Sequence, residues 1–430
     1  MISTLVRPNG VHCPNITKLP NGLTIITEQI PVSAVNLNIW FNVGSAIESD
    51  NINGMAHFLE HMIFKGSTKL ASGEFERLLE AKGAVTNAAT SQEYTHFYFT
   101  SAPQDFADIL PLQLDLVLNP LLPSIEFDRE KMVVLEEIRR SHDNPRRKVS
   151  EKMMKNVFPN LPYHRPILGT REIIENLTYQ QMQSFHHSWY QPSGMTVVAV
   201  GNLPVEKLTQ SIIDSLSIEK INLQPERVKY QPESPFKEII TEEYTDTSLQ
   251  QSRLILTWRV PGLNNFSETL PLDVLAVILG QGKVSRLFRD LRENRHLVTR
   301  ISANNMTHQI QGAFSVSAQL SQKNIPLVKD IILNHLAEIQ TNGVTQAELN
   351  RVCQIVANQF IFQSEKPGDR TNLYGYYYSQ VKSITPALEY AEKIRNLTTE
   401  DIQKAAQKFI NLNAYGEIIA LDDEKLGIRN

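Results

Sequence analysis

The spacing of apolar residues predicts short strands and amphipathic helices in alternation through the first half of the chain. Residues 36–43 carry apolar side chains at every second position, which is typical of a strand with one buried face. From Met55 onward the apolar residues recur at intervals of three and four, which predicts a helix closed by Gly66. The predicted strands of this half are 23–28, 36–43, a pair across 85–101, and 195–200, and the further helices are 72–82, 106–118, 124–142, 178–190 and 205–216.

The second half of the chain repeats this pattern. The segment Leu254–Val260 resembles Asn36–Val43, and Phe314–Gln319 matches Phe97–Ala102 at an offset close to 217 residues. An amphipathic helix follows each of these last two segments. We therefore expect an α+β protein of two similar domains related by internal duplication, each an antiparallel-rich mixed sheet packed with helices.

A change in composition marks the boundary between the halves. Residues 219 to about 237 hold Pro225, Pro232 and Pro235 among polar residues with little periodicity, which is typical of a linker. We predict an N-terminal domain at 1–220, a linker at 221–237 and a C-terminal domain at 238–430.

Charge and composition narrow the possible functions. The net charge is -4, and no basic stripe is visible, so we expect no nucleic-acid partner. No stretch approaches the roughly 20 apolar residues of a membrane span, and Met1–Asn15 lacks the apolar core of a secretion signal, so we expect no membrane association. The two cysteines, Cys13 and Cys353, form no motif, which fits a reducing compartment and a cytoplasmic location.

The helix that begins at Met55 carries two histidines and a glutamate, His57-Phe-Leu-Glu60-His61. Residues four apart share one helix face, so His57 and His61 can converge on one metal ion. Glu60 lies on nearly the same face and can accept a proton from a water molecule without binding the ion. Zinc suits this pattern, because a catalytic zinc typically has three protein ligands and one water.

The predicted helix 124–142 offers carboxylates for the third ligand. Glu130 and Glu137 are seven residues apart on one face, with two valines between them. Carboxylates on an apolar face are costly to bury unless they are paired or bind a metal. Glu136 and Glu137 point roughly 100° apart, so only one of the two can reach the ion, and periodicity groups Glu137 with Glu130. Glu130 is alternatively a supporting or salt-bridging residue.

These residues resemble a known family of inverted-motif zinc peptidases. The segment His57-Phe-Leu-Glu-His-Met-Ile-Phe-Lys-Gly-Ser67 is similar to the active-site helix of the pitrilysin/insulysin family, and most of all to that of the mitochondrial processing peptidase β-subunit and its bacterial relatives. The resemblance covers nearly the whole chain and extends to Asn87–Thr95, Glu130–Arg139, Pro162–Gly169 and Tyr190–Gly201.

The resemblance implies roles for the residues that match the family motifs. It implies that His57 and His61 bind zinc, that Glu60 is the general base, and that Glu130 supports the site. The family's third ligand lies 76 residues beyond the second histidine, at Glu137. Asn87 and Ala88 match an edge strand that binds an extended peptide by main-chain hydrogen bonds. The expected protein is a zinc metalloendopeptidase that acts on extended or unfolded peptides.

One position departs from the family pattern. Family members pair an arginine with a tyrosine seven residues later, and both bind substrate near the zinc. Arg292 matches the arginine, whereas Thr299 stands in place of the tyrosine and offers no phenol. The resemblance implies a dimer, and Thr299 favours pairing with a homologous subunit that lacks the zinc motif over pairing with itself.

Three other interpretations carry less weight. Relatives that act as non-catalytic scaffold subunits have generally lost the metal motif, which is intact here. A phosphate loop around Lys283 fails its pattern, because Val277 and Val284 stand at the positions that need glycine and serine or threonine. The other histidines of the first half that invite a metal role are expected to be structural, namely His96, His186 and His187.

Overall fold

The computed structural model describes residues 14–216 and 224–423, which fall into two compact units. Unit 1 comprises Met1–Arg139, Arg165–Val228 and Gln363–Ala387, and unit 2 comprises the remainder. Cys13, most of Met1–Asn15 and residues 217–223 of the predicted linker region lie outside the described residues. Among the described residues, no helix is both long and apolar enough to cross a membrane.

Unit 1 is built on a six-stranded mixed sheet in the order β1-β2-β6-β3-β5-β4. Strand β2 pairs with β6 in parallel, and every other neighbouring pair is antiparallel. The order leaves one side of β4 at the edge of the sheet. The predicted strands are present, and β1 is an addition to them. Their bounds are β1 Asn15–Lys18, β2 Thr24–Gln29, β3 Val35–Phe41, β4 Val85–Thr90, β5 Thr95–Ser101 and β6 Met195–Gly201.

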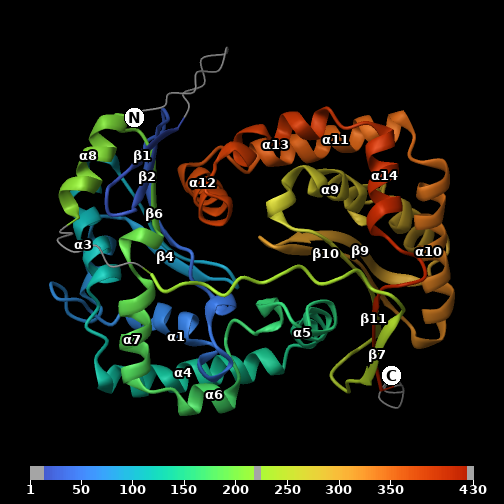
Figure 1. Ribbon diagram of the computed structural model, residues 1–430, viewed down its shortest axis with the longest axis horizontal. Coiled ribbons are helices and arrows are strands. Elements are labelled where there is room, and N and C mark those ends of the chain that lie inside the picture. Colours follow the sequence, from blue (N-terminus) through green and yellow to red (C-terminus); the bar gives the residue numbers. More distant parts are fainter. Residues whose placement is uncertain (1–13, 217–223, 424–430) are drawn as a thin grey trace. The chain divides into compact units, whose positions relative to one another are not determined.

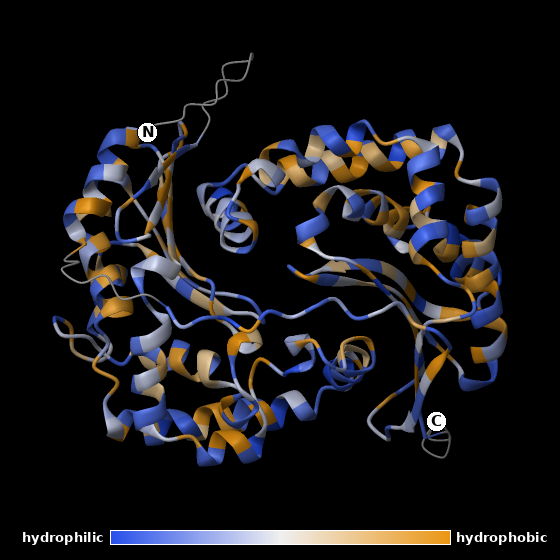
Figure 2. Ribbon diagram, viewed as in Figure 1, coloured by the Kyte–Doolittle hydropathy of each residue, from blue (hydrophilic) through white to orange (hydrophobic). Residues whose placement is uncertain are grey.

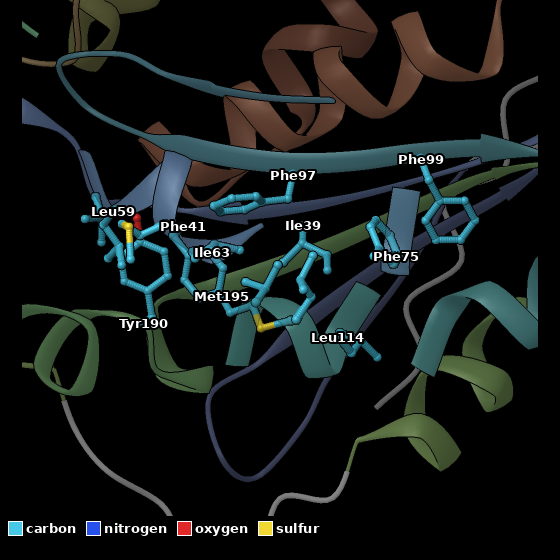
Figure 3. Packing of buried hydrophobic residues seen from close by; sticks show 14 of the residues in the cluster. Ile39, Phe41, Leu59, Ile63, Phe75, Phe97, Phe99, Leu114, Tyr190 and Met195 are labelled. Atoms are coloured by element: carbon cyan, nitrogen blue, oxygen red, sulfur yellow. The ribbon is translucent and has the colours of Figure 1, made fainter. Parts of the chain in front are cut away.

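Helices cover one face of this sheet and enclose the core of unit 1. Ile39 and Phe97 point from the sheet toward Ile63 of α1 and Leu114 of α3 (Figure 3), and all four are buried. Helix α1 ends at Ile63, so Gly66, at φ 108°, lies in the turn that follows and does not close the helix as expected. The helices are α1 Met55–Ile63, α2 Glu74–Ala81, α3 Phe106–Leu118, α4 Ser124–His142, α6 Arg171–Asn176, α7 Tyr179–Trp189 and α8 Val205–Ser215.

The other face of the unit 1 sheet is covered by α12, Pro367–Val381, which comes from the second half of the sequence (Figure 1). Gly375 lies against Trp40 of β3 so closely that a Cβ atom there would stand 2.1 Å from the indole Nε1. Polar contacts hold the rest of the helix, such as Asn38 Nδ2 to Asn372 Oδ1 at 2.7 Å. The interface is therefore fixed by hydrogen bonds and close packing rather than by apolar area alone.

Unit 2 contains a five-stranded sheet in the order β7-β11-β8-β10-β9. This order and its pairing repeat β2-β6-β3-β5-β4 of unit 1, including the single parallel pair. The duplication and the α+β class predicted from the sequence are therefore confirmed. The strands are β7 Ile240–Thr245, β8 Ser252–Pro261, β9 Val298–Thr307, β10 Gln311–Leu320 and β11 Gly416–Leu421.

The helices of unit 2 include one that precedes the predicted linker. This helix, α5 Pro145–Val157, packs against β8 and β11, just as α12 packs against the corresponding strands β3 and β6. Several helices carry both hydrophilic and hydrophobic residues, as amphipathic helices do (Figure 2). The others are α9 Phe266–Gly280, α10 Ile325–Asn342, α11 Gln346–Phe362, α13 Thr385–Arg395 and α14 Thr399–Phe409.

Each compact unit thus contains one helix from the other half of the sequence. Unit 1 contains α12, and unit 2 contains α5. Residues 224–237 form neither helix nor strand, as expected of a linker. The boundaries at 220 and 238 stay a prediction.

Candidate active site

The N-terminus of α1 is anchored by a buried carboxylate, Glu48. Its two oxygens accept hydrogen bonds from the amides of Gly54 and Ala56, each at 2.7 Å, and from the Asn53 side chain at 2.8 Å. Burial raises the pKa of Glu48 to about 7, although these hydrogen bonds oppose the shift. Gly54 has φ 97°, and a Cβ atom there would meet the Leu168 carbonyl oxygen at 2.6 Å, so glycine is required where α1 begins.

Three side chains from α1 and α4 converge at one point. The Nε2 atoms of His57 and His61 lie 3.6 and 3.7 Å from the same oxygen, Oε2 of Glu137. Stacking of Phe58 on Phe127, at 4.7 Å between ring centroids, packs the two helices together and brings these groups into register. Within the part of the chain that the structure describes, this is the group of histidines and carboxylates with the spacing of a metal site.

The spacing of these donor atoms fits zinc. In a tetrahedral zinc site with bonds of about 2.0–2.2 Å, ligand atoms lie roughly 3.3–3.6 Å apart. The separation of 3.6 Å between His57 Nε2 and Glu137 Oε2 lies at the upper end of this range, and that of 3.7 Å from His61 Nε2 lies just above it. Two imidazoles and one carboxylate are also the donor types that catalytic zinc takes, with a fourth position left for water or substrate.

The neighbouring carboxylate, Glu136, is directed elsewhere. It binds Arg139 through two hydrogen bonds of 2.8 Å on the exposed side of α4. The structure therefore places Glu137, and not Glu136, beside the histidines. Of the two valines between the carboxylates, Val134 is buried and Val133 is 46% exposed, so only part of that face is apolar core.

Glu130 orients His61. One oxygen of Glu130 lies 2.9 Å from His61 Nδ1, and the other accepts from Lys65 Nζ at 2.8 Å. Burial raises the pKa of Glu130, but the hydrogen bonds from Lys65 and His61 outweigh burial and hold the pKa below its usual value. An ionised Glu130 accepts a hydrogen bond from His61 Nδ1–H, and in this tautomer Nε2 carries the lone pair that a metal ion can use.

Glu60 lies close to the donor group without belonging to it. Burial raises the pKa of Glu60 above its usual value, and a hydrogen bond from Thr90 and the charge of His61 oppose that shift. Thr90, the last residue of β4, donates to Glu60 Oε2 at 2.5 Å. The edge strand and the predicted general base are therefore in direct contact.

The predicted substrate strand lies at the sheet edge. Asn87 and Ala88 are central residues of β4, and the side chain of Asn87 accepts a hydrogen bond from the Ala88 amide at 2.9 Å. That amide points away from β5, toward the unpaired edge. It is therefore a main-chain group that an extended peptide can reach.

Arg292 and Thr299 belong to unit 2. Arg292 is exposed in the helical turn Phe288–Asn294, where its guanidinium lies over the Phe288 ring at 4.7 Å. Thr299 is the second residue of β9 and donates hydrogen bonds to Gln251 and to the Gln319 carbonyl. Both residues are thus engaged in local contacts within unit 2.

Other histidines of the first half take structural roles. His96 hydrogen-bonds to Asn38 at 3.1 Å and stacks on Trp40, and His186 hydrogen-bonds to the Val117 carbonyl at 2.9 Å. Burial lowers the pKa of each to about 4, so both are neutral near pH 7.

Sequence reasoning missed Glu48, Lys65 and Thr90. A glutamate shortly before a helix start is a signal for Glu48, because carboxylates stabilise helix N-termini. Lys65 and Thr90 gave no such signal, since their partners depend on how α1 packs against α4 and β4.

The fold and the donor group together define a metal-dependent hydrolase with an inverted zinc-binding motif. Comparison with family models agrees: the model described as Insulinase (Peptidase family M16) matches residues 24–171, and the model described as Peptidase M16 inactive domain matches residues 176–356. The chain belongs to peptidase family M16 and is a zinc protease of that family.

Individual relatives support this assignment. An uncharacterized zinc protease of Rickettsia felis is 28% identical over 410 residues, covering 95% of this chain and 98% of its own. The zinc protease PqqE of Helicobacter pylori is 26% identical, with coverage of 91% and 89%. The crystal structure of a protease from Helicobacter pylori has the same fold, with a TM-score of 0.89, 23% identity, and coverage of 95% of this chain and 99% of that one.

Proposed function

We propose that this protein hydrolyses extended or unfolded peptides, with zinc held by His57, His61 and Glu137 and with Glu60 as general base. The observation that carries the proposal is the convergence of three ligand atoms beside a fourth, separate carboxylate. A purely structural zinc site is closed by four protein ligands, whereas this group supplies three.

The residues divide the chemistry between them. Zinc, when bound, polarises a scissile carbonyl and lowers the pKa of water. Glu60 takes the proton from the attacking water and returns it to the leaving amine, and its raised pKa suits a group that must do both. Glu130 keeps His61 in the tautomer that can bind the ion.

We propose that β4 binds the substrate as an added strand. Its outer edge is unpaired within the sheet, and the Ala88 amide is directed toward it. Main-chain pairing places little demand on sequence, which suits a protease for unfolded peptides. Asn87 would move away from the Ala88 amide when the peptide binds.

A two-subunit assembly is the second part of the proposal. The likeness of the His57–Ser67 segment to processing peptidase β-subunits supports a partner that lacks the zinc motif. Thr299 is already hydrogen-bonded to Gln251, and it lacks a phenol, so Arg292 has no tyrosine companion seven residues on. Activity of the purified chain alone, as a self-associated dimer, would favour the homodimer instead.

The substitution Glu60→Gln tests the assigned chemistry. We expect the variant to bind zinc at the wild-type stoichiometry and to lose about 10²–10⁴-fold in turnover of an unstructured fluorogenic peptide. Metal analysis and peptide cleavage, with and without any co-purifying homologue, are measured on the same preparations. A zinc-loaded Glu60→Gln variant with wild-type turnover would contradict the role, and a wild-type chain that neither binds zinc nor cleaves would favour a scaffold function.

A cytoplasmic location is also proposed. The scarcity of cysteines supports it, together with Cys353, which is a free thiol buried in α11. Fractionation of the native source with an antibody tests it, and recovery outside the cytoplasm would contradict it.

A further inference from the structure

We propose that Thr90 is a positioning residue that holds the Glu60 carboxylate in place and couples it to the substrate strand. The proposal rests on the proposed function, because it assumes that Glu60 is the general base. It assigns a role to a side chain that neither the metal motif nor the donor group includes.

Counting hydroxyl protons fixes the direction of the contact. Thr90 and Thr95 face each other across β4 and β5, with their hydroxyl oxygens 3.3 Å apart. Thr95 uses its single proton to donate to the Val43 carbonyl oxygen at 2.8 Å. It can therefore only accept from Thr90, and the Thr90 proton is directed to the much closer Glu60 oxygen at 2.5 Å.

This arrangement gives the two oxygens of Glu60 different tasks. Oε2 is engaged by Thr90, so the carboxylate cannot rotate freely about its terminal torsion. Oε1 is then the oxygen that takes the proton. A hydrogen bond between a hydroxyl and a carboxylate is among the stronger ones in proteins, which suits a positioning role.

The same residue belongs to the strand edge. Side chains alternate along β4, and Thr90 lies two residues after Ala88, so both side chains point to the α1 side of the sheet. The backbone of Thr90 likewise faces the open edge, as that of Ala88 does. A peptide that pairs with this edge therefore aligns against the backbone of Thr90, whose side chain orients Glu60. The register of the bound peptide and the position of the Glu60 carboxylate are then set by the same residue.

The test compares Thr90→Val, which keeps the shape and removes the donor, with Thr90→Ser, which keeps the donor. We expect Thr90→Val to lower kcat about tenfold to a hundredfold, with KM within about twofold and full zinc content. Thr90→Ser should retain most of kcat. Thr27→Val is the matched control, because it removes a buried hydroxyl contact to Thr209 elsewhere in the same sheet, and its activity should not change.

Two outcomes overturn the inference: a wild-type kcat in Thr90→Val, with or without a rise in KM, or an equal loss of kcat in Thr90→Ser and Thr90→Val. Should Thr90→Val fail to fold, Thr90→Cys, a weak donor of small size, is expected to show the same loss and is judged by the same outcomes. Glu60→Gln is measured alongside. If Glu60→Gln is active, the proposed function itself is contradicted. If Glu60→Gln is inactive and Thr90→Val has wild-type kcat, only the positioning role of Thr90 is contradicted.

Discussion

Lys65, Glu130 and His61 form a chain of hydrogen bonds that ends at the candidate metal group. The lysine keeps Glu130 ionised, Glu130 fixes the His61 tautomer, and His61 presents Nε2 to the donor group. Because Glu130 would act on a bound ion through His61, we expect its loss to change metal affinity without removing a proposed ligand.

We expect Glu130→Gln to weaken zinc binding about 10- to 100-fold, because an amide oxygen is a poorer acceptor for the His61 Nδ1 proton. Glu137→Gln should weaken it further, since it changes a ligand. Competition with a chromogenic chelator measures both. Glu136→Gln is the matched control, because Glu136 pairs with Arg139 on the exposed side of α4, and a comparable loss there would refute the division of roles.

Part of this candidate site could be predicted from the sequence alone. Spacing paired His57 with His61, since four residues make about one helical turn. Periodicity favoured Glu137 over Glu136 as the third ligand, and the family resemblance implied Glu137. In the structure, Glu137 lies beside the histidines, whereas Glu136 pairs with Arg139. Thr90 was out of reach, because its contact with Glu60 spans 30 residues and depends on strand and helix packing together.

At the scale of elements, periodicity predicted those helices and strands of unit 1 that bury one face, such as α3 and β4, and β6 was found as a short apolar run that is buried throughout. Helix α3 was predicted with the bounds that it has, and Thr178 caps α7 with a capping box, as its position suggested. The exchange of α5 and α12 was not predictable. Periodicity shows which face of a helix is buried, but not which sheet it is buried against.

The close packing of α12 on β3 requires glycine at position 375. We expect Gly375→Ala to destabilise unit 1 by about 1–3 kcal/mol, because the added Cβ overlaps the Trp40 ring and must push helix and strand apart. Urea unfolding followed by Trp fluorescence measures this. Gly73→Ala is a partial control: it has space around its Cβ, but φ 76° adds backbone strain. A Gly375→Ala variant as stable as the wild type would contradict the tight packing.

At the scale of the whole molecule, the two units share a strand order, and within residues 14–216 and 224–423 the candidate metal group lies in unit 1. Where unit 1 has α1, unit 2 has α9, which is apolar and largely buried. Its half-buried Asp273 carboxylate accepts hydrogen bonds from Asn305 at 2.8 Å and Tyr390 at 2.8 Å, and desolvation raises its pKa to about 6. The repeated scaffold thus carries the candidate metal group of the described residues in its first copy.

Removal of zinc should lower the stability of unit 1. Binding to the folded state alone contributes about 4 kcal/mol when free zinc is about a thousand times Kd, which corresponds to roughly 10 °C for a unit of this size. Calorimetry of the chain after chelation and after zinc is restored measures the shift. His57→Ala should show no zinc-dependent shift, and identical melting of the wild type in both states would argue against the site.

Helix α12 also bears on how the protein is made. Translation delivers β3 and β6 long before Pro367–Val381 leaves the ribosome, so the growing chain carries Trp40 on an uncovered sheet for most of its synthesis. An mRNA truncated at the linker would encode the metal ligands but not the helix that shields their sheet. We therefore expect nascent chains of this length to expose apolar surface that chaperones bind, and we expect the first half expressed alone to be unstable.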